Sequence, residues 1–189
     1  MTAVAVETIR AQINVPLIAI EPAVKPAVAM TMSKHIAVLA TATTVKGKNL
    51  KSLIETYAQD IKVSLVPCIG LAEKIETGKA HTAEVKDYLK NILAPLVEQK
   101  VDTIILGCTH YPLLLEEIKK HVPASVKIIT QGEIVAAGLV DYLQRHPEMD
   151  AQCSKSGTIK FFTTDSTENF NRQATKFFGS AVQSEHLHL

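Results

Sequence analysis

The sequence has no tryptophan, and aromatic residues make up only 5% of its 189 residues. This scarcity argues against a surface of aromatic rings that stacks on the bases of single-stranded nucleic acid. An excess of one charge is also lacking, because 20 lysines and arginines face 19 aspartates and glutamates, for a formal net charge of +1. Such a balance gives no electrostatic basis for binding nucleic acid or an anionic membrane surface. We therefore expect neither as a partner.

Cysteine is scarce as well, with three widely spaced residues, Cys68, Cys108 and Cys153. An odd number without a CxxC pair excludes a disulfide framework and the common zinc patterns. The most apolar stretch, residues 15–32, is interrupted by Glu21 and Lys25, so it does not meet the requirement for a membrane span. The first residues also lack the basic and apolar regions of a signal peptide. We expect a cytoplasmic protein with reduced thiols.

Short β-branched runs alternate with segments of helical period, and this alternation predicts the α/β class. The predicted strands are residues 15–20, 35–41, 63–67, 102–107, 126–130 and 158–163. The predicted helices, in which apolar residues recur at helical spacing, are residues 3–12, 48–59, 82–99, 112–120 and 133–144. Several strand runs are apolar throughout, which is typical of a parallel sheet covered by helices on both faces.

Two segments have the features of hinges between lobes. Residues 21–27 contain two prolines that restrict the backbone, and residues 129–133 are rich in polar residues and glycine. We predict that residues 28–130 form one complete α/β lobe, and that residues 1–27 and 131–189 are the remnant of another. The last seven residues, QSEHLHL, are expected to be frayed.

The stretch GCTHYP, residues 107–112, holds the candidate site, because it follows a predicted strand. Ligands of parallel α/β sheets bind at the carboxyl ends of strands, where Cys108, Thr109 and His110 would lie. Pro112 suits the first turn of a helix. The helix N-terminus and the imidazole would lower the pKa of the thiol and make it a base or a nucleophile. The alternatives are a small buried hydrophobic cysteine and a Cys-x-His metal site, for which no further ligand cluster is evident.

Polar residues also follow two other predicted strands. The threonines around Thr41 and Thr44 offer hydroxyls and backbone N–H groups to a carboxylate or phosphate, and the alternative is ordinary helix capping. Further along the chain, Glu73 or Glu76 could face a cleft, although exposed helical glutamates are commoner. Cys68 is interpreted as buried, and Cys153 as a loop residue.

Taken together, these stretches resemble the glutamate racemases. GCTHYPLL (107–114) is similar to the second cysteine motif of that family. Three further stretches resemble its segment between the lobes, its threonine loop and its glutamate segment, in the same order: IAIEPAVKPA (18–27), IAVLATATTVKGKNL (36–50) and PCIGLAEKIETG (67–78). AVAVETIR (3–10) resembles the helix after the first cysteine motif. The resemblance covers nearly the whole chain, and GCTHYP in this company is highly specific.

The resemblance implies a two-lobed aspartate/glutamate racemase-like fold and an isomerase that interconverts L- and D-glutamate for peptidoglycan synthesis, with no cofactor and no metal. One thiolate removes the α-proton and a second thiol returns one on the opposite face, because inversion needs an acid and a base on opposite faces. Hydrogen-bond donors around glutamate stabilise the carbanion. The resemblance implies catalytic roles for Cys108 and His110, and substrate-binding roles for Thr109, Thr41, Thr44 and Glu76.

The chain also departs from the family pattern. The first cysteine of the family stands in a Cys-Asn-Thr-Ala motif, and this chain starts a few residues too late to include it. Thr130-Gln131-Gly132 stands where the family has Asp-Ser-Gly. We therefore expect an incomplete first lobe without the first catalytic thiol, and self-association, as a homodimer for example, through its exposed apolar face. One alternative is an inactive fragment, or a non-catalytic binding or self-associating protein of racemase ancestry. Another is a related racemase that acts on aspartate or another amino acid.

Overall fold

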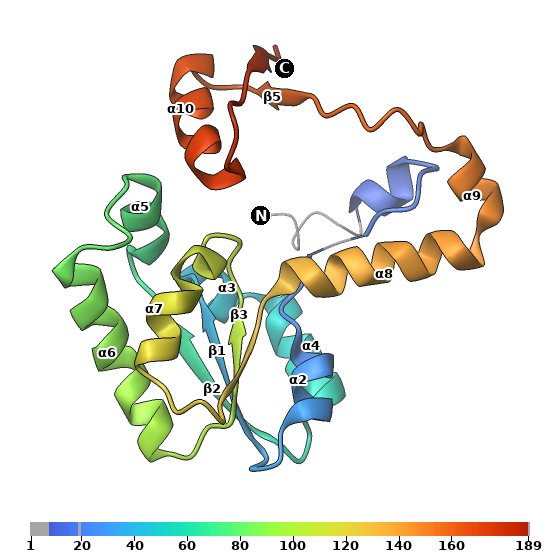
Figure 1. The fold of residues 1–189 in the computed structure, drawn as a ribbon. Coiled ribbons are helices and arrows are strands. Elements are labelled where there is room, and N and C mark those ends of the chain that lie inside the picture. The colour runs from blue at the N-terminus through green and yellow to red at the C-terminus, as the bar shows by residue number, and fades with distance from the viewer. Residues whose placement is uncertain (1–7, 19, 189) are drawn as a thin grey trace. The chain divides into compact units, whose positions relative to one another are not determined.

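The computed structural model describes residues 8–18 and 20–188 (Figure 1). The chain divides into two compact units, Met1–Tyr142 and Leu143–Leu189. The elements of the first unit are α2 (Val24–Met30), β1 (His35–Ala40), α3 (Ala42–Lys46), α4 (Lys48–Tyr57), β2 (Lys62–Pro67), α5 (Leu71–Glu76), α6 (Ala83–Glu98), β3 (Thr103–Leu106), the 3-10 helix η1 (Tyr111–Leu114), α7 (Leu115–Lys120) and β4 (Lys127–Ile129). Helix α8 (Gln131–Arg145) begins in the first unit and ends in the second.

The four strands of the first unit form one parallel sheet in the order β2-β1-β3-β4. Strand β1 pairs with β2 from His35↔Lys62 to Ala40↔Pro67, and with β3 up to Leu39↔Leu106. This register brings the carboxyl ends of β1, β2 and β3 to the same edge of the sheet. The predicted α/β class with a parallel sheet is confirmed.

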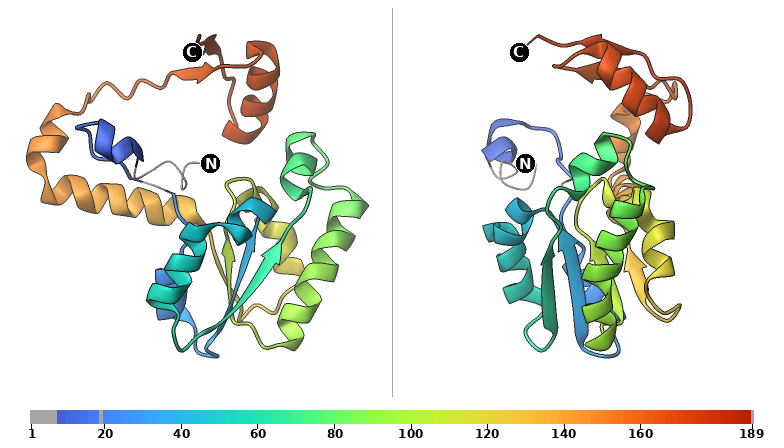
Figure 2. Two further views of the ribbon diagram at one scale, coloured as in Figure 1. Left: turned by 180° about the vertical axis from the view of Figure 1, so that it is seen from behind. Right: turned by 90° about the vertical axis from the view of Figure 1, so that its left-hand side faces the viewer.

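Helices cover both faces of this sheet, as the views in Figure 2 show. Alternate residues of β1 belong to two hydrophobic clusters, Ala37 and Leu39 to one and Ile36 and Val38 to the other. Successive side chains of a strand point to opposite faces, so a strand between two helical layers must be apolar at every position. All six residues of β1 are buried, as this arrangement requires.

Helix α6 shows how the sequence period produces one of these layers. Its buried residues are Val85, Leu89, Leu93 and Leu96, which are spaced three and four apart and form one face of the helix. They join the cluster of Ala37 and Leu39, together with buried residues of α5, η1 and α7. On the other face of the sheet, α2 and α4 contribute the buried residues of the second cluster.

The second unit contains α9 (Pro147–Gln152), β5 (Phe161–Thr163), α10 (Thr167–Phe178) and β6 (Ser184–His186). Its two strands pair in parallel, and the rings of Phe161 and Phe178 meet edge to face with centroids 5.2 Å apart. Among the described residues of this unit, Val182 is the one buried hydrophobic residue. The unit therefore has little core of its own.

Two expectations about local structure were wrong. Residues 15–18 and 20 form no strand, because no strand in the described part of the chain pairs with them. The tail QSEHLHL was expected to be frayed, but in its described part Ser184–His186 form β6 beside β5. The first residues of the predicted helix 3–12 lie outside the described residues, and residues 8–12 are helical. The division into a lobe at 28–130 and a remnant lobe stays a prediction.

Candidate active site

Cys108 lies at the edge of the sheet where the parallel strands end. Strand β3 ends at Leu106, which pairs with Leu39 of β1, so Thr41 and Cys108 follow neighbouring strands at this edge. The backbone N–H of Gly107 donates to the carbonyl of Leu39 at 2.7 Å, which extends the pairing by one residue. This is the position predicted for the candidate site.

Gly107 lets the two strands approach at this point. A Cβ atom at position 107 would lie 3.1 Å from the Cβ of Ala40 and 3.2 Å from the carbonyl oxygen of Leu39. A side chain would therefore push β3 away from β1 directly before the cysteine. The close packing of β1 and β3 is thus a physical reason for glycine at the first position of the GCTHYP stretch.

A thiol, an imidazole and a carboxylate form a continuous chain at the site. The Sγ of Cys108 lies 3.7 Å from Nδ1 of His110, and Nε2 of His110 lies 2.9 Å from Oε1 of Glu76. When the carboxylate accepts the Nε2–H, Nδ1 is left as an acceptor that faces the thiol. This arrangement can move a proton between sulfur and imidazole while Glu76 holds the ring.

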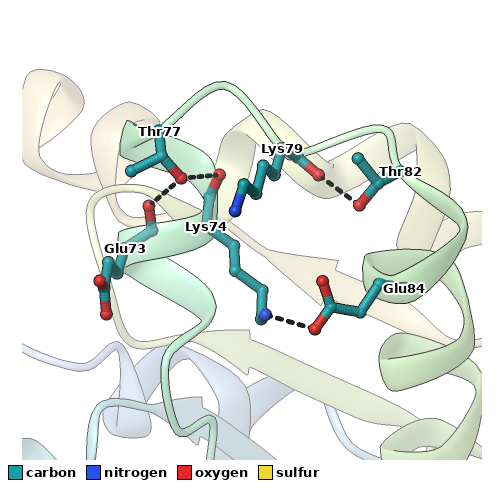
Figure 3. A network of polar contacts seen from close by, with 6 residues as sticks. All are labelled: Glu73, Lys74, Thr77, Lys79, Thr82 and Glu84. Carbon is teal, nitrogen blue, oxygen red and sulfur yellow. Dashed lines mark hydrogen bonds and ion pairs between the residues drawn. The ribbon is translucent and has the colours of Figure 1, made fainter.

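Glu76, which contacts His110, is the last residue of α5. The end of this helix is held by Thr77, whose hydroxyl donates to the carbonyls of Glu73 at 2.9 Å and Lys74 at 3.3 Å (Figure 3). Lys74 also pairs with Glu84 of α6, with 2.6 Å between Nζ and Oε1. The segment on both sides of Glu76 is therefore tied to its neighbours. Both candidate glutamates, Glu73 and Glu76, are exposed, and Glu76 is the one that contacts His110.

Burial of the Cys108 thiol raises its pKa above the ordinary value. The backbone N–H groups of His110 and Tyr111 act in the opposite direction, and the negative charge of Glu76 raises the pKa further. The expectation of a lowered pKa was wrong. The helix expected over 112–120 is present as the 3-10 helix η1 followed directly by α7, but the N–H groups of its first turn do not outweigh desolvation.

Tyr111 was not predicted as part of the site, although it borders it. Its ring is fully buried, and its hydroxyl donates to the carbonyl of Cys68 at 3.4 Å. It therefore links the turn after β3 to the turn after β2, which leads into the helix of Glu76. Cys68 is buried as expected, and burial raises the pKa of its thiol to about 12. The aromatic residue beside His110 was the available signal for this link.

The threonines occupy the same edge of the sheet but cap a helix. The hydroxyl of Thr41 accepts from the backbone N–H of Thr44 at 3.3 Å, and the two hydroxyls lie 3.0 Å apart. Thr41 is thus the N-cap of α3, as one of the two interpretations held. Thr109 is exposed. In the described part of the chain, no group of three His, Cys, Asp or Glu residues could hold a metal ion.

Comparison with known proteins gives the relatives of this chain. The family model described as Asp/Glu/Hydantoin racemase matches residues 1–139. A glutamate racemase of Pseudomonas paraeruginosa is 37% identical over 167 residues, which are 88% of this chain and 62% of that protein. The chain therefore spans less than two thirds of the length of this relative.

Solved structures of glutamate racemases have the same fold. An isoform from Bacillus anthracis superposes with a TM-score of 0.83 at 31% identity, covering 100% of this chain and 70% of that one. The enzyme from Escherichia coli, solved with L-glutamate and the activator UDP-MurNAc-ala, superposes with a TM-score of 0.79 at 25% identity, covering 98% of this chain and 69% of that one. By the family match and by these similarities, the chain belongs to the Asp/Glu/hydantoin racemase family.

Proposed function

We propose that this chain carries an acid/base centre of a cofactor-independent glutamate racemase. The observation that supports the proposal best is the chain of contacts from Cys108 through His110 to Glu76, at 3.7 Å and 2.9 Å. The substrate is proposed from the relatives, which are named glutamate racemases. The proposed role is the supply of D-glutamate for peptidoglycan precursors in the cytoplasm.

The proposed step is transfer of the α-proton of glutamate to Cys108. The thiol first passes its proton to Nδ1 of His110, and the carboxylate of Glu76 stabilises the imidazolium. The resulting thiolate takes the α-proton and becomes a thiol again, which leaves a carbanion on the substrate. In the reverse direction the thiol donates its proton to the carbanion. A thiol with a raised pKa is protonated at rest, so it is ready to act as the acid.

The carbanion needs hydrogen-bond donors, because no cofactor is proposed to spread its charge. The hydroxyls of Thr41, Thr44 and Thr109 are proposed to bind the substrate at the same edge of the sheet. The capping bond of Thr41 uses its oxygen as an acceptor, and when Thr44 donates in the 3.0 Å hydrogen bond between the two hydroxyls, the O–H of Thr41 is left as a donor for the substrate. Capping of α3 and substrate binding are therefore compatible.

Inversion also requires a proton on the opposite face of the α-carbon. Cys68 is not proposed for this task, because its side chain is 2% exposed and its pKa is raised to about 12. Cys153 is not proposed either, because its Sγ donates to the carbonyl of Met149 at 3.4 Å and has no acid or base as a hydrogen-bond partner among the described residues. We propose that the described residues perform the proton transfer on one face.

Exchange of the α-proton of glutamate with D2O, followed by NMR, tests this proposal. Wild type is expected to exchange the α-proton, and Cys108→Ser is expected to lower the rate by at least about 100-fold, because a hydroxyl is a much weaker acid than a thiol. Cys153→Ser is the matched control and should retain the wild-type rate. Equal rates for wild type and Cys108→Ser would refute the role of this thiol.

A further inference from the structure

A cavity separate from the candidate site lies in the first unit, and none of the candidate site residues lines it. Its volume is about 240 Å³, and it is bounded by segment 21–26, by α4 and by the first residues of α8. The lining residues at its polar positions are Glu21, Lys25, Tyr57 and Gln131. This volume suits a small molecule, below the size of a drug-like ligand.

Gln131 is a buried amide at the wall of this cavity. Its side chain lines the cavity and is only 8% exposed. Its Nε2 has no hydrogen-bond partner among the described residues. A buried amide donor without an acceptor costs free energy, and a half-turn of the terminal amide exchanges the positions of Nε2 and Oε1. Because Nε2 has less than 1 Å² of accessible surface, an acceptor group in the cavity would reach this amide only after such a half-turn.

Two opposite charges border the same cavity. Glu21 and Lys25 both line it, and the described structure contains no ion pair between them. Glu21 accepts one hydrogen bond, from Nδ2 of Asn49 at 3.3 Å, so its carboxylate has further acceptor capacity. The Nζ of Lys25 lies 5.7 Å from the centre of the Tyr57 ring. Both charges are thus available to a ligand that carries the two complementary charges.

The rest of the wall is apolar. It is formed by Pro22, Ala23, Val24, Pro26, Leu53, Ile134 and Val135. We propose that this cavity binds a free neutral amino acid with an apolar side chain, of the size of valine or leucine. The ammonium group would bind Glu21, and the carboxylate would bind Lys25 and the amide of Gln131. Glutamate fits less well, because the apolar wall offers no donor to a second carboxylate.

The experiment is an NMR titration of the full chain with L-leucine. The expected result is saturable shifts of the backbone amides in 21–26 and 131–135, with a dissociation constant on the order of 1 mM. Leucine methyl ester lacks the carboxylate and 4-methylpentanoate lacks the ammonium group, so both are expected to bind at least about 10-fold more weakly. Absence of shifts up to about 20 mM leucine would mean that the cavity holds only water, and would overturn the proposal.

Four variants locate the binding. Glu21→Gln and Lys25→Met should each weaken leucine binding by about 10-fold, whereas Lys119→Met, at a separate cavity, should leave it unchanged. Melting curves establish that each variant is folded. Cys108→Ser should bind leucine as wild type does, since this cavity does not include the proposed acid/base centre. Binding that survives both Glu21→Gln and Lys25→Met, or that is lost in Cys108→Ser, would contradict the assignment.

Discussion

The chemistry of Cys108 results from opposing influences on one sulfur atom. Burial raises the pKa of the thiol, while two backbone N–H groups lower it and the carboxylate of Glu76 raises it again. His110 lies between the sulfur and that carboxylate. Its imidazole can therefore accept the proton that leaves the sulfur when the thiolate forms. The site is thus better described as a thiol with a proton acceptor beside it than as a permanent thiolate.

Replacement of His110 tests the proton acceptor. His110→Asn should slow exchange of the α-proton of glutamate by about 10²–10⁴-fold, because asparagine cannot accept a proton in this pH range. His81→Asn changes an exposed histidine and serves as the matched control. If His110→Asn exchanges as fast as this control, the imidazole takes no part in the transfer.

The raised pKa of Cys108 gives a second prediction. The rate of its alkylation by iodoacetamide, followed by mass spectrometry of the peptide, should be low at pH 7 and should still be increasing above pH 9, because the thiolate is the reactive form and the pKa is raised from 9.0. A rate that reaches its plateau at or below about pH 7.5 would show a lowered pKa.

The strands and the turns at their ends determine where these side chains lie. The turn after β3 carries Cys108 and His110, and α5, which follows β2, carries Glu76. The opposite ends of the strands are fixed by Asp102, which accepts from the hydroxyls of Thr31 and Thr103 and from two backbone N–H groups of the loop after α2. Both ends of β3 are therefore bound to neighbouring segments.

A pair of glycine substitutions tests the packing between β1 and β3. Gly107→Ala should destabilise the protein by roughly 1–3 kcal/mol, since the new methyl group meets the backbone and Cβ of β1. Gly138→Ala lies in α8 with no atom within 4 Å of its Cβ, and should stabilise by about 0.5–1 kcal/mol. Urea denaturation measures both. A stabilising Gly107→Ala would show that β3 shifts without cost.

The lowered pKa of Asp102 predicts that the free energy of unfolding depends on pH. Burial alone would raise the pKa of this carboxyl, but its four donors hold it well below the ordinary value. The carboxylate therefore contributes stability above the unfolded pKa of about 3.9, and this stability is lost as the pH falls toward the lower folded pKa. Asp102→Asn should cost roughly 2 kcal/mol at pH 7, because two backbone N–H groups would face the new amide.

The control for this prediction is the exposed Asp60→Asn, which should change the free energy of unfolding by less than about 0.5 kcal/mol. The difference between wild type and Asp102→Asn should narrow as the pH falls below about 4. A difference that stays constant from pH 7 to pH 2 would show that the charge of Asp102 contributes nothing.

At the scale of the whole molecule, the chain consists of two units whose hydrophobic cores differ in size. The first unit has helices on both faces of a buried sheet, whereas the described part of the second unit buries one hydrophobic residue, Val182. Residues 151–160 are exposed throughout. Stability is therefore expected to differ between the units.

Hydrogen exchange measures this difference. The amides of β1 and β3 should exchange by global unfolding and be the slowest, while the amides of α9 and β5 should exchange at least about 100-fold faster through local opening. Equal protection across both units would contradict separate cores.

Much of this fold could be predicted from the sequence, because local patterns determine it. The strands at 35–41, 63–67, 102–107 and 126–130 are apolar and β-branched, and the structure has them within two residues. Strand β6 could not be predicted, because Ser184–His186 are polar and become a strand only by pairing with β5. The strand predicted at residues 15–20 failed in the opposite way: the composition of this segment favours a strand, but residues 15–18 and 20 pair with no strand in the described part of the chain.

The candidate site shows the same limit. The position of Cys108 and His110 follows from the strand that precedes them, and that much was predictable. The contact between Glu76 and His110 depends on how α5 and the turn after β3 pack together, which no local pattern contains. The pKa of the Cys108 thiol depends on its burial, and burial follows from the whole layer of α5, α6 and η1.

The most direct test of the central claim is α-proton exchange in D2O with L- and D-glutamate offered separately to the wild-type chain. The proposed acid/base centre predicts exchange of one enantiomer, expected to be L-glutamate, because the described residues serve one face of the α-carbon. Exchange with neither enantiomer, in a chain shown to be folded, would contradict the claim that Cys108, His110 and Glu76 form a working acid/base centre.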